Sequence, residues 1–409
     1  MTGPASQPAA ERKIQHDDDA RQATQVGAAF ERMFGRPPDA IAAAPGRIEF
    51  VGNHTDYNGG RVLGAAIDRE IYVAVAARSD ERRRFATDLD LDRIIEIPAG
   101  LLRKQEGSAA WTNYPLGVLN AFAETGIGLS HGFDFLACST LPEGSGLSSS
   151  AALELASAFA FLQLAERSLP LERIVALCRR AENEFVGVPC GILDQAVSAF
   201  GRRNHLVSID CRGPNFTTVA LPDGVNFWVF NTHTRHALID GLYAERHREC
   251  MEAARALGVP LLADATVELL GDSPGRLSDT LTRRALHIIG ENARVRQISA
   301  MLQTGNLGSV GRLLNESHTS SRVNFENSTP ELDFLASALS GLPQVYGARL
   351  TGGGFGGAVL ALAGAEFDAA AADAVADRYA EHFAARPDVL QLRTSNGARV
   401  LHGRHYSVF

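Results

Sequence analysis

The sequence predicts an α+β protein with two domains, and three observations lead to this fold class. The chain has 409 residues, whereas single domains typically contain ~100–200 residues. Strand-like and helical patterns follow one another without the strict alternation of a doubly wound parallel sheet. Glycine, proline and asparagine cluster over residues 212–223, where a domain boundary is expected. We therefore predict an N-terminal domain over residues 26–215 and a C-terminal domain over residues 216–409.

Composition excludes several functional classes. The formal net charge of −8 argues against a nucleic-acid binder with a basic surface. No apolar run reaches the ~18–20 residues that a membrane span needs, and the polar N-terminal segment lacks the apolar core of a secretory signal. The five cysteines are widely spaced and form no C-x-x-C pair, which argues against a disulfide framework or a structural zinc site. A protein of the reducing cytoplasm is expected.

The first half of the chain shows strand and helix patterns in a mixed order. Residues 1–25 are polar and are predicted to form a flexible tail. A short helix is expected over residues 23–33, because Gly35 and a proline pair follow it. Strand patterns cover residues 71–76 and 132–139, and helical spacing covers residues 111–124, 151–167, 171–184 and 192–200.

The second half is mostly helical. Strands are expected over residues 205–209 and 226–231, and helical patterns then dominate from residue 237 to residue 340. Two further strands, 348–351 and 358–363, flank a glycine cluster, and residues 368–384 are predicted to form the last helix. We find no short-period repeat, so a solenoid or propeller is not indicated.

A glycine- and serine-rich segment at residues 144–150 leads into an alanine-rich helix. Glycines let the backbone approach a ligand closely, and free amides at a helix N-terminus favour phosphate. The segment is not a Walker loop, because no G-K-[ST] sequence follows. A flexible turn in which serine caps the helix is the alternative that this segment alone leaves open.

A second glycine cluster, residues 351–357, formally contains G-x-G-x-x-G. A dinucleotide-binding fold would require a helix directly afterwards and an acidic residue ~20 positions further on. Residues 358–363 have the pattern of a strand instead. We therefore predict a tight glycine hairpin whose backbone approaches a ligand or another loop.

A third segment, residues 45–60, gathers arginine, histidine, aspartate, tyrosine and two asparagines in one loop. Such convergent hydrogen-bonding groups suit a hydroxyl-rich ligand such as a sugar. A polar surface turn is the alternative, and His54 with Asp56 is only a weak metal-binding pattern. Two acids complete the set of candidates: Glu182, on a predicted helix, and Asp194, near a helix start where aspartate often acts only as a dipole partner.

Taken together, these segments resemble the galactokinase branch of the GHMP kinase superfamily. Its signature reads G-R-x-N-x-[IL]-G-E-H-T-D-Y, and residues 46–57 of this chain read G-R-I-E-F-V-G-N-H-T-D-Y. The motifs G-x-G-L-S-S-S-A and T-G-G-G-F-G-G are intact at residues 144–151 and 351–357. The resemblance covers roughly residues 25–403. It implies a two-domain GHMP-kinase-like fold, with a mixed sheet and helices in each domain, an N-terminal domain for sugar and phosphate, and an active site in the cleft.

The resemblance further implies an ATP-dependent sugar 1-kinase, with galactose as the expected substrate. Asp194 would be the catalytic base and Arg47 its charge partner. The ATP phosphates would lie against Gly144, Ser145, Gly146, Leu147, Ser148, Ser149 and Ser150. Ser150 and Glu182 would bind Mg²⁺, and the sugar would lie against Asn53, His54, Thr55, Asp56 and Tyr243. ATP and a sugar are the expected partners, without nucleic acid or membrane, and the oligomeric state stays open, although a monomer fits.

The chain also departs from the signature in its sugar-binding segment. Asn53 replaces a glutamate that lies near the C6 hydroxyl of the sugar in the family, and Glu49 replaces an asparagine. A neutral Asn53 near Arg61 would tolerate the C6 carboxylate of galacturonate, or a pentose such as L-arabinose. A non-catalytic sugar sensor is a third hypothesis, but the intact serine loop, Glu182, Asp194 and Arg47 argue against it.

Overall fold

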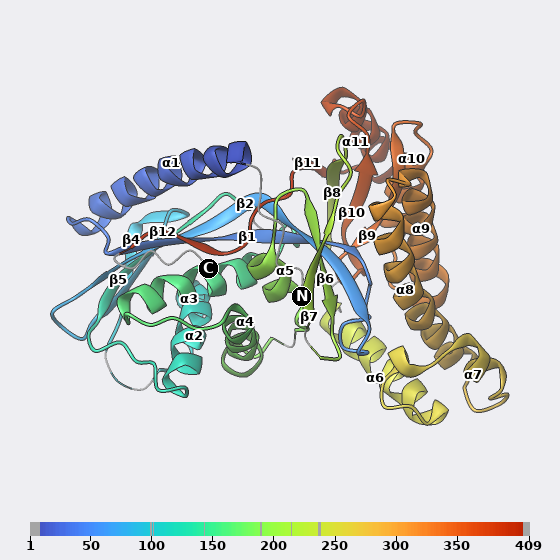
Figure 1. Ribbon diagram of the computed structural model, residues 1–409, viewed down its shortest axis with the longest axis horizontal. Helices are drawn as coiled ribbons and strands as arrows, with labels where there is room; N and C mark the ends of the chain where they lie inside the picture. The colour runs from blue at the N-terminus through green and yellow to red at the C-terminus, as the bar shows by residue number, and fades with distance from the viewer. Residues whose placement is uncertain are drawn as a thin grey trace.

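The computed structural model describes residues 9–98, 100, 102–142, 144–188, 190–213, 215–235 and 239–403, with side chains from residue 16 onward except those of residues 235, 239 and 240. Over these residues the predicted α+β class is confirmed: two β-sheets, each packed against helices, form the two halves of the molecule (Figure 1).

The larger sheet follows the order β12-β1-β2-β5-β3-β4, and β6 and β7 extend it beside β2. Its strands are β1 (Ala40–Val51), β2 (Arg61–Ala77), β3 (Arg83–Thr87), β4 (Asp90–Ile97), β5 (Phe133–Ser139), β6 (His205–Asp210), β7 (Asn215–Ala220) and β12 (Arg399–His402). The last strand comes from the end of the described chain and pairs with β1. A domain boundary between residues 215 and 216 does not predict that a strand from the C-terminal part of the chain joins the larger sheet.

Helices cover both faces of the larger sheet (Figure 1). The first helix, α1 (Ala9–Phe34), packs on one face, where Phe30 meets Ile41 and Ala43. The opposite face, with Ala42 and Ala44, packs against α2 (Asn113–Ala123), α3 (Ser149–Leu164), α4 (Leu171–Arg180) and α5 (Leu193–Phe200). Alternate residues of β1 thus point to opposite sides of the sheet, and both sides are apolar. A 3₁₀ turn (Gly107–Thr112) precedes α2, and a π-helical turn (Ala181–Val186) follows α4.

The prediction of a flexible tail over residues 1–25 is wrong for the described part, because α1 already begins at Ala9. Residues 1–8 lie outside the described residues. From residue 16 onward, where its side chains are described, Val26 and Phe30 are the buried residues of the helix, so its polar composition is compatible with packing on the sheet. The Arg399 guanidinium also forms ion pairs with Asp19 of α1 (2.6 Å) and with Glu70 of β2 (2.7 Å). Polar composition alone therefore does not distinguish a tail from a helix that exposes most of its surface.

The smaller sheet has the order β11-β8-β10-β9. Its strands are β8 (Asn226–Arg235), β9 (Val345–Thr351), β10 (Gly356–Ala363) and β11 (Asp388–Leu392). The helices of this half are α6 (Ile239–Leu257), α7 (Val267–Gly271), α8 (Asp279–Gln303), α9 (Leu307–Ser320), α10 (Pro330–Ser340) and α11 (Ala369–Phe383), with a 3₁₀ turn at Leu262–Asp264 and a π-helical turn at Ser321–Phe325. Most of the second half is helical, as predicted.

The two halves share one hydrophobic core. One face of the smaller sheet, including Trp228 and Phe230, packs under α10 and α11. The other face, including Phe227, joins the core of the larger sheet, where the rings of Phe50 and Phe227 meet edge to face at 5.8 Å. The division into domains at residues 26–215 and 216–409 stays a prediction.

Several strands were not predicted because they are short or strongly charged. β3 and β4 form a hairpin whose outer strand carries exposed acidic and basic residues. The cluster at residues 212–223, which was predicted to be a linker, includes the turn between β6 and β7 and the strand β7 itself.

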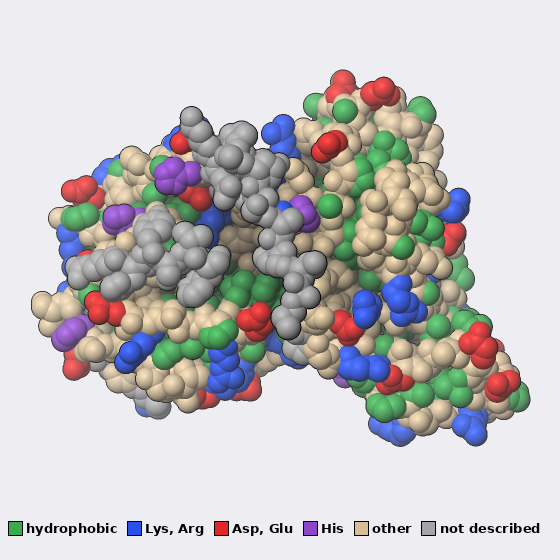
Figure 2. Space-filling view, viewed as in Figure 1, with side chains coloured by type: hydrophobic (Ala, Val, Ile, Leu, Met, Phe, Trp, Pro, Cys, Tyr) green, Lys and Arg blue, Asp and Glu red, His purple; other side chains and the backbone are tan. Residues whose placement is uncertain are grey.

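Among the described residues, no helix has the length and apolar character that crossing a membrane would require. On the face shown in Figure 2, acidic and basic side chains are interspersed and do not gather into one basic area.

Candidate active site

The central pair of the site is Arg47 with Asp194, which join β1 to the first turn of α5. The Arg47 guanidinium donates two parallel hydrogen bonds to the Asp194 carboxylate, Nε to Oδ1 and Nη2 to Oδ2, both 2.7 Å long. Burial lowers the pKa of Arg47, but the charge and hydrogen bonds of Asp194 outweigh it and the pKa lies above its ordinary value. This fork fixes the position and orientation of the aspartate side chain.

The serine loop at residues 144–150 contacts this pair directly. Arg47 Nη1 donates to the carbonyl of Gly146 (2.8 Å), and the Ser148 hydroxyl donates to Asp194 Oδ2 (2.5 Å). Ser148 caps α3 with a left-handed backbone (φ 59°), an uncommon conformation for a residue with a side chain. The structure therefore places the Ser148 hydroxyl on the aspartate, while the loop amides stand at the N-terminus of α3.

Two carboxyl groups, those of Glu182 and Glu154, are linked beside the loop by one glutamine side chain. Gln195 donates through Nε2 to Glu182 (2.6 Å) and to Glu154 (3.1 Å), and the Ser150 hydroxyl also bonds to Glu182. Burial raises the pKa of Glu182, and the nearby Asp194 charge adds to this shift. No described arginine or lysine forms an ion pair with Glu182. Oxygen ligands with surplus negative charge suit a hard divalent cation.

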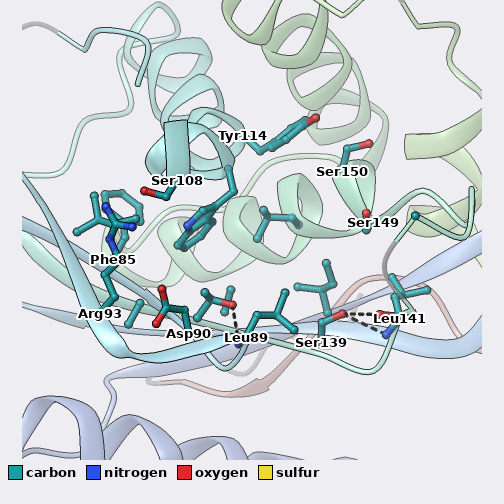
Figure 3. Close-up of a pocket in the computed structure, with 18 of the residues that line it drawn as sticks. Phe85, Leu89, Asp90, Arg93, Ser108, Tyr114, Ser139, Leu141, Ser149 and Ser150 are labelled. Carbon is teal, nitrogen blue, oxygen red and sulfur yellow. Dashed lines mark hydrogen bonds between the residues drawn. The ribbon is translucent and has the colours of Figure 1, made fainter. Parts of the chain in front are cut away.

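A cavity of about 430 Å³ opens beside the serine loop and is lined mainly by apolar side chains (Figure 3). Its walls include Phe85 of β3, Leu89, Trp111 and Tyr114, and its mouth includes Ser149 and Ser150. This volume and lining are typical of a small-molecule site. These wall residues were not predicted from the sequence, since they come from a charged hairpin, a 3₁₀ turn and the start of α2, none of which carries a motif. The presence of one of only two tryptophans at a helix start was the sole local signal.

A second cavity, of about 640 Å³, borders the turn that precedes α5. Asp56, Tyr57 and Tyr243 line it, together with Cys190 and Gly191 from the turn before α5. A side chain at Gly191 would overlap the Asp56 carboxylate, because an added Cβ would lie 1.7 Å from Oδ2. Burial raises the pKa of Asp56, and backbone hydrogen bonds oppose this shift. Asp56 and Tyr243 thus present polar groups to a cavity large enough for a sugar.

Segments next to the Arg47–Asp194 pair line both cavities. Ser149, next to Ser148, lines the first cavity, and Ile192, two residues before Asp194, lines the second.

The structure places two predicted sugar ligands away from this open space. Thr55 is fully buried and its hydroxyl contacts the carbonyls of Gly52 and Arg61, both at 2.7 Å. His54 Nε2 lies 3.0 Å from the Gly353 carbonyl, which can only accept, so Nδ1 accepts from the Tyr57 hydroxyl at 2.8 Å. Burial lowers the pKa of His54 to about 3, so the ring is neutral. Both residues hold the loop that carries Asp56.

Asn53 is also fully buried, and its side-chain amide bonds to Glu49, Asn327 and the Gly352 carbonyl. Arg61, at the start of β2, was expected to lie near Asn53. Its guanidinium forms an ion pair with Asp210 of β6 (2.7 Å). Whether Asn53 meets the C6 substituent of a sugar stays a prediction.

The C-terminal half holds the sugar-binding segment through residues that the sequence analysis did not single out. Glu291 of α8 accepts from the backbone amides of Gly52 (3.1 Å) and Asn53 (3.3 Å). His287 lies one turn earlier, with Nε2 3.2 Å from the Asn53 carbonyl. Polar residues at positions 284, 287 and 291 share a buried helix face, and this i, i+3, i+7 spacing was the available signal.

The glycine hairpin at residues 351–357 lies against this segment. The Gly354 backbone approaches Asn327 so closely that an added Cβ would lie 2.3 Å from the Asn327 carbonyl. Phe355 donates its amide to the same carbonyl (2.6 Å). Of the two roles predicted for the hairpin, the structure shows the close approach to another loop.

Comparison with known proteins agrees with this geometry. Sequence models of three families match the chain: the GHMP kinases N terminal domain at residues 113–202, the GHMP kinases C terminal domain at residues 298–385, and the galactokinase galactose-binding signature at residues 28–77. Fold and site together define a sugar kinase of the GHMP class. A crystal structure of mevalonate kinase shares the fold at 17% identity (TM-score 0.59, covering 87% of this chain and 99% of that chain).

Galactokinases are more similar. Galactokinase of Roseiflexus sp. is 40% identical over 339 residues, or 81% of this chain and 85% of that protein. Human galactokinase is 36% identical over 91% of this chain and 95% of its own length. The crystal structure of Lactococcus lactis galactokinase complexed with galactose has a TM-score of 0.87 at 30% identity, covering 92% of this chain and 99% of that chain. The chain belongs to the galactokinase family.

Proposed function

We propose that this protein transfers the γ-phosphoryl group of ATP to the 1-hydroxyl of galactose. The observation that carries the proposal is the Arg47–Asp194 pair, held by two 2.7 Å hydrogen bonds and connected through Ser148 and Ile192 to segments that line a cavity at the serine loop and a cavity at Asp56. Phosphoryl transfer needs alignment and charge stabilisation more than covalent chemistry, and this arrangement supplies both.

In this proposal, Asp194 accepts the proton of the sugar 1-hydroxyl as the new O–P bond forms. Arg47 keeps the carboxylate oriented through its two hydrogen bonds, and it adds positive charge near the transferred group. Ser148 holds Asp194 Oδ2 from the opposite side. The backbone amides at Gly144–Ser150 bind the phosphates at the start of α3, with the base of the nucleotide against Trp111 and Tyr114.

A divalent ion bound with ATP would be held by the Ser150 hydroxyl and the Glu182 carboxylate, and Mg²⁺ is the ion we propose. The raised pKa of Glu182, caused first by burial, fits this role because a cation would stabilise its ionised form. The ion neutralises phosphate charge when bound. Gln195 keeps the Glu182 carboxylate in place from behind.

On the sugar side, Asp56 and Tyr243 contact the hydroxyls directly, while His54 and Thr55 act through the shape of their loop. If Asn53 and Arg61 faced C6 of the sugar, they would determine whether the site prefers galactose, galacturonate or L-arabinose. The ion pair of Arg61 with Asp210 removes the cation proposed to attract a C6 carboxylate, which favours galactose.

The five free cysteines support our further proposal of a reducing, cytoplasmic location.

The test is a panel of galactose, galacturonate, L-arabinose and glucose with ATP and Mg²⁺, read as ADP release and as the position of the phosphate in the product. We expect galactose to give the highest kcat/KM and a 1-phosphate. A higher kcat/KM with galacturonate or L-arabinose would assign the related sugar 1-kinase. Sugar binding without ADP release from any substrate would contradict kinase activity.

A further inference from the structure

The Glu49 and Asn53 side chains form a hydrogen-bonded pair at the place where the two halves of the molecule meet. Asn53 Nδ2 donates to Glu49 Oε1 at 3.1 Å, and Glu49 is 5% exposed while Asn53 is 0% exposed. In the signature that this segment resembles, position 49 is asparagine and position 53 is glutamate. The chain therefore carries the same two side-chain types with their positions exchanged.

Each member of the pair is held by the C-terminal half. Glu49 Oε1 also accepts from Arg349 Nη2 (3.1 Å), and Arg349 is fully buried with no other carboxylate in its described ion pairs. Asn53 Nδ2 donates its second hydrogen to the Gly352 carbonyl (2.7 Å), and Asn53 Oδ1 accepts from Asn327 (2.8 Å). We call Glu49, Asn53, Asn327, Arg349 and the Gly352 carbonyl the polar contact.

Most of the hydrogen-bonding capacity of the Asn53 side chain is taken by protein partners. An amide nitrogen has two hydrogens, and Glu49 and Gly352 take both. A sugar hydroxyl that accepts from Nδ2 would have to displace one of these buried bonds, which leaves a buried group unpaired, and only the second lone pair of Oδ1 is not used by the described bonds. This geometry favours a positioning role for Asn53 over a direct sugar contact.

We propose that Glu49 and Asn53 are one exchanged, energetically coupled pair that positions the sugar-binding loop through the polar contact, and that the pair, not Asn53 alone, determines how well the site accepts galactose. The inference rests on the proposed function for its kinetic consequence only. In this proposal, the polar contact needs one carboxylate and one amide between Arg349 and Asn327. Arg349 and Asn327 both keep a partner whether the carboxylate stands at position 49 or at position 53.

The single substitutions are expected to fail for different reasons. Asn53→Glu places a second carboxylate beside Glu49 and against the Gly352 carbonyl, so two buried like charges share one arginine. Glu49→Asn removes the carboxylate from the buried Arg349 and leaves its charge unpaired. The exchange of both, E49N/N53E, keeps one carboxylate, lets the amide now at position 49 donate to it, and retains the bond from Asn327. The Gly352 carbonyl loses its donor, and Arg349 keeps the amide oxygen at position 49 as an acceptor, with the single carboxylate beside it at position 53.

The experiment compares wild type, E49N, N53E and E49N/N53E in urea unfolding and in kinetics with galactose and ATP. Each single variant should lower kcat/KM for galactose by about tenfold to a hundredfold, mainly through KM for galactose, with KM for ATP little changed. The double variant should recover to within a few-fold of wild type. R386Q, in an exposed ion pair of α11, serves as the control with unchanged kinetics.

A second, isosteric cycle (E49Q, N53D and E49Q/N53D) moves the charge without changing volume and covers the case that an exchanged side chain does not fit. In either cycle, a double variant more stable and more active than both singles supports the pair, even when a single variant does not fold. A double variant no better than its worse single in both cycles overturns it. If wild type does not phosphorylate galactose, the proposed function fails, while the unfolding free energies still decide whether the two positions are coupled.

Discussion

The serine loop at residues 144–150 and the glycine hairpin at residues 351–357 have similar compositions but opposite surroundings. The first borders an open cavity at the N-terminus of α3, and an added Cβ at Gly146 would meet no atom within 4 Å. The second packs against Asn327 and the loop of Asn53. Gly146 in the serine loop leaves room for a ligand, whereas Gly354 in the hairpin leaves room for protein. The presence of glycine alone does not distinguish the two roles.

The largest effect is expected from Asp194→Asn, at the pair that the serine loop surrounds. Losing the proton acceptor should reduce kcat by about 10²–10⁴-fold, because general-base catalysis typically contributes this much. ATP affinity should remain close to wild type, since the serine loop and its cavity are intact. Steady-state ADP release and a nucleotide-binding titration measure the two effects. A folded variant with near wild-type kcat would remove Asp194 from the mechanism.

A smaller loss is expected from Glu182→Gln, at the proposed metal site beside the same loop. Replacing a carboxylate ligand should raise the Mg²⁺ concentration for half-maximal rate by at least about tenfold, since even indirect partners of a metal contribute 10–100-fold. The KM for galactose should change little. The measurement is the rate as a function of Mg²⁺ at fixed ATP and galactose.

Glu154→Gln is the matched control, because it alters the other carboxyl that Gln195 binds. If both variants show wild-type magnesium dependence, neither acid belongs to a metal site.

The hairpin offers a matched pair of substitutions, Gly354→Ala and Gly352→Ala. Both glycines have φ near +80°, so alanine costs about 1–2 kcal/mol at either position. Only at Gly354 would the new Cβ overlap protein, 2.3 Å from the Asn327 carbonyl, which adds about 1–3 kcal/mol. Urea unfolding should therefore show a larger loss for Gly354→Ala, together with a higher KM for galactose. Equal losses would indicate that the hairpin does not press on Asn327.

Much of the fold was predictable because its signals are local. The strands over 348–351 and 358–363 are found within β9 and β10, and the helix after the serine loop is α3. The start of α1 at Ala9 was missed because its polar sequence lacks a strong apolar period. The hairpin β3–β4 was missed because most residues of its outer strand are exposed and several are charged.

Less of the candidate site was predictable, for a different physical reason. The pairing of Arg47 with Asp194 followed from a motif, but the contacts of Asn53 with Asn327 and Gly352 join segments about three hundred positions apart. No local pattern encodes such contacts, so the sequence alone suggested that Asn53 faces a ligand. The apolar cavity at Trp111 and Phe85 was missed for the same reason, since its walls come from separate elements.

The last and smallest expected effect is the pH dependence of stability. It also distinguishes the hairpin from the serine loop. Burial lowers the pKa of His54, which contacts Gly353, to about 3, and lowers the pKa of His287 to about 4. Both folded values lie below the ordinary value near 6.5, so the folded protein keeps these rings neutral. Their contribution to stability is complete above pH 6.5 and is lost as the pH falls towards 3 to 4.

The predicted slope is up to about 1.4 kcal/mol per pH unit for each histidine below pH 6.5. Buried carboxyls with raised pKa values, such as Glu49 and Asp56, act in the opposite direction, so the difference between variants is the quantity to measure. His54→Gln should lower the free energy of unfolding at pH 7. The difference in unfolding free energy from wild type should narrow between pH 6.5 and pH 5, because only the wild-type protein has this ring to protonate on unfolding. Urea unfolding at several pH values gives this difference, with His131→Gln, at an exposed position, as the control. A difference that stays constant with pH would show that His54 is not held neutral against Gly353, and the hairpin would lose one of the contacts that set it apart from the serine loop.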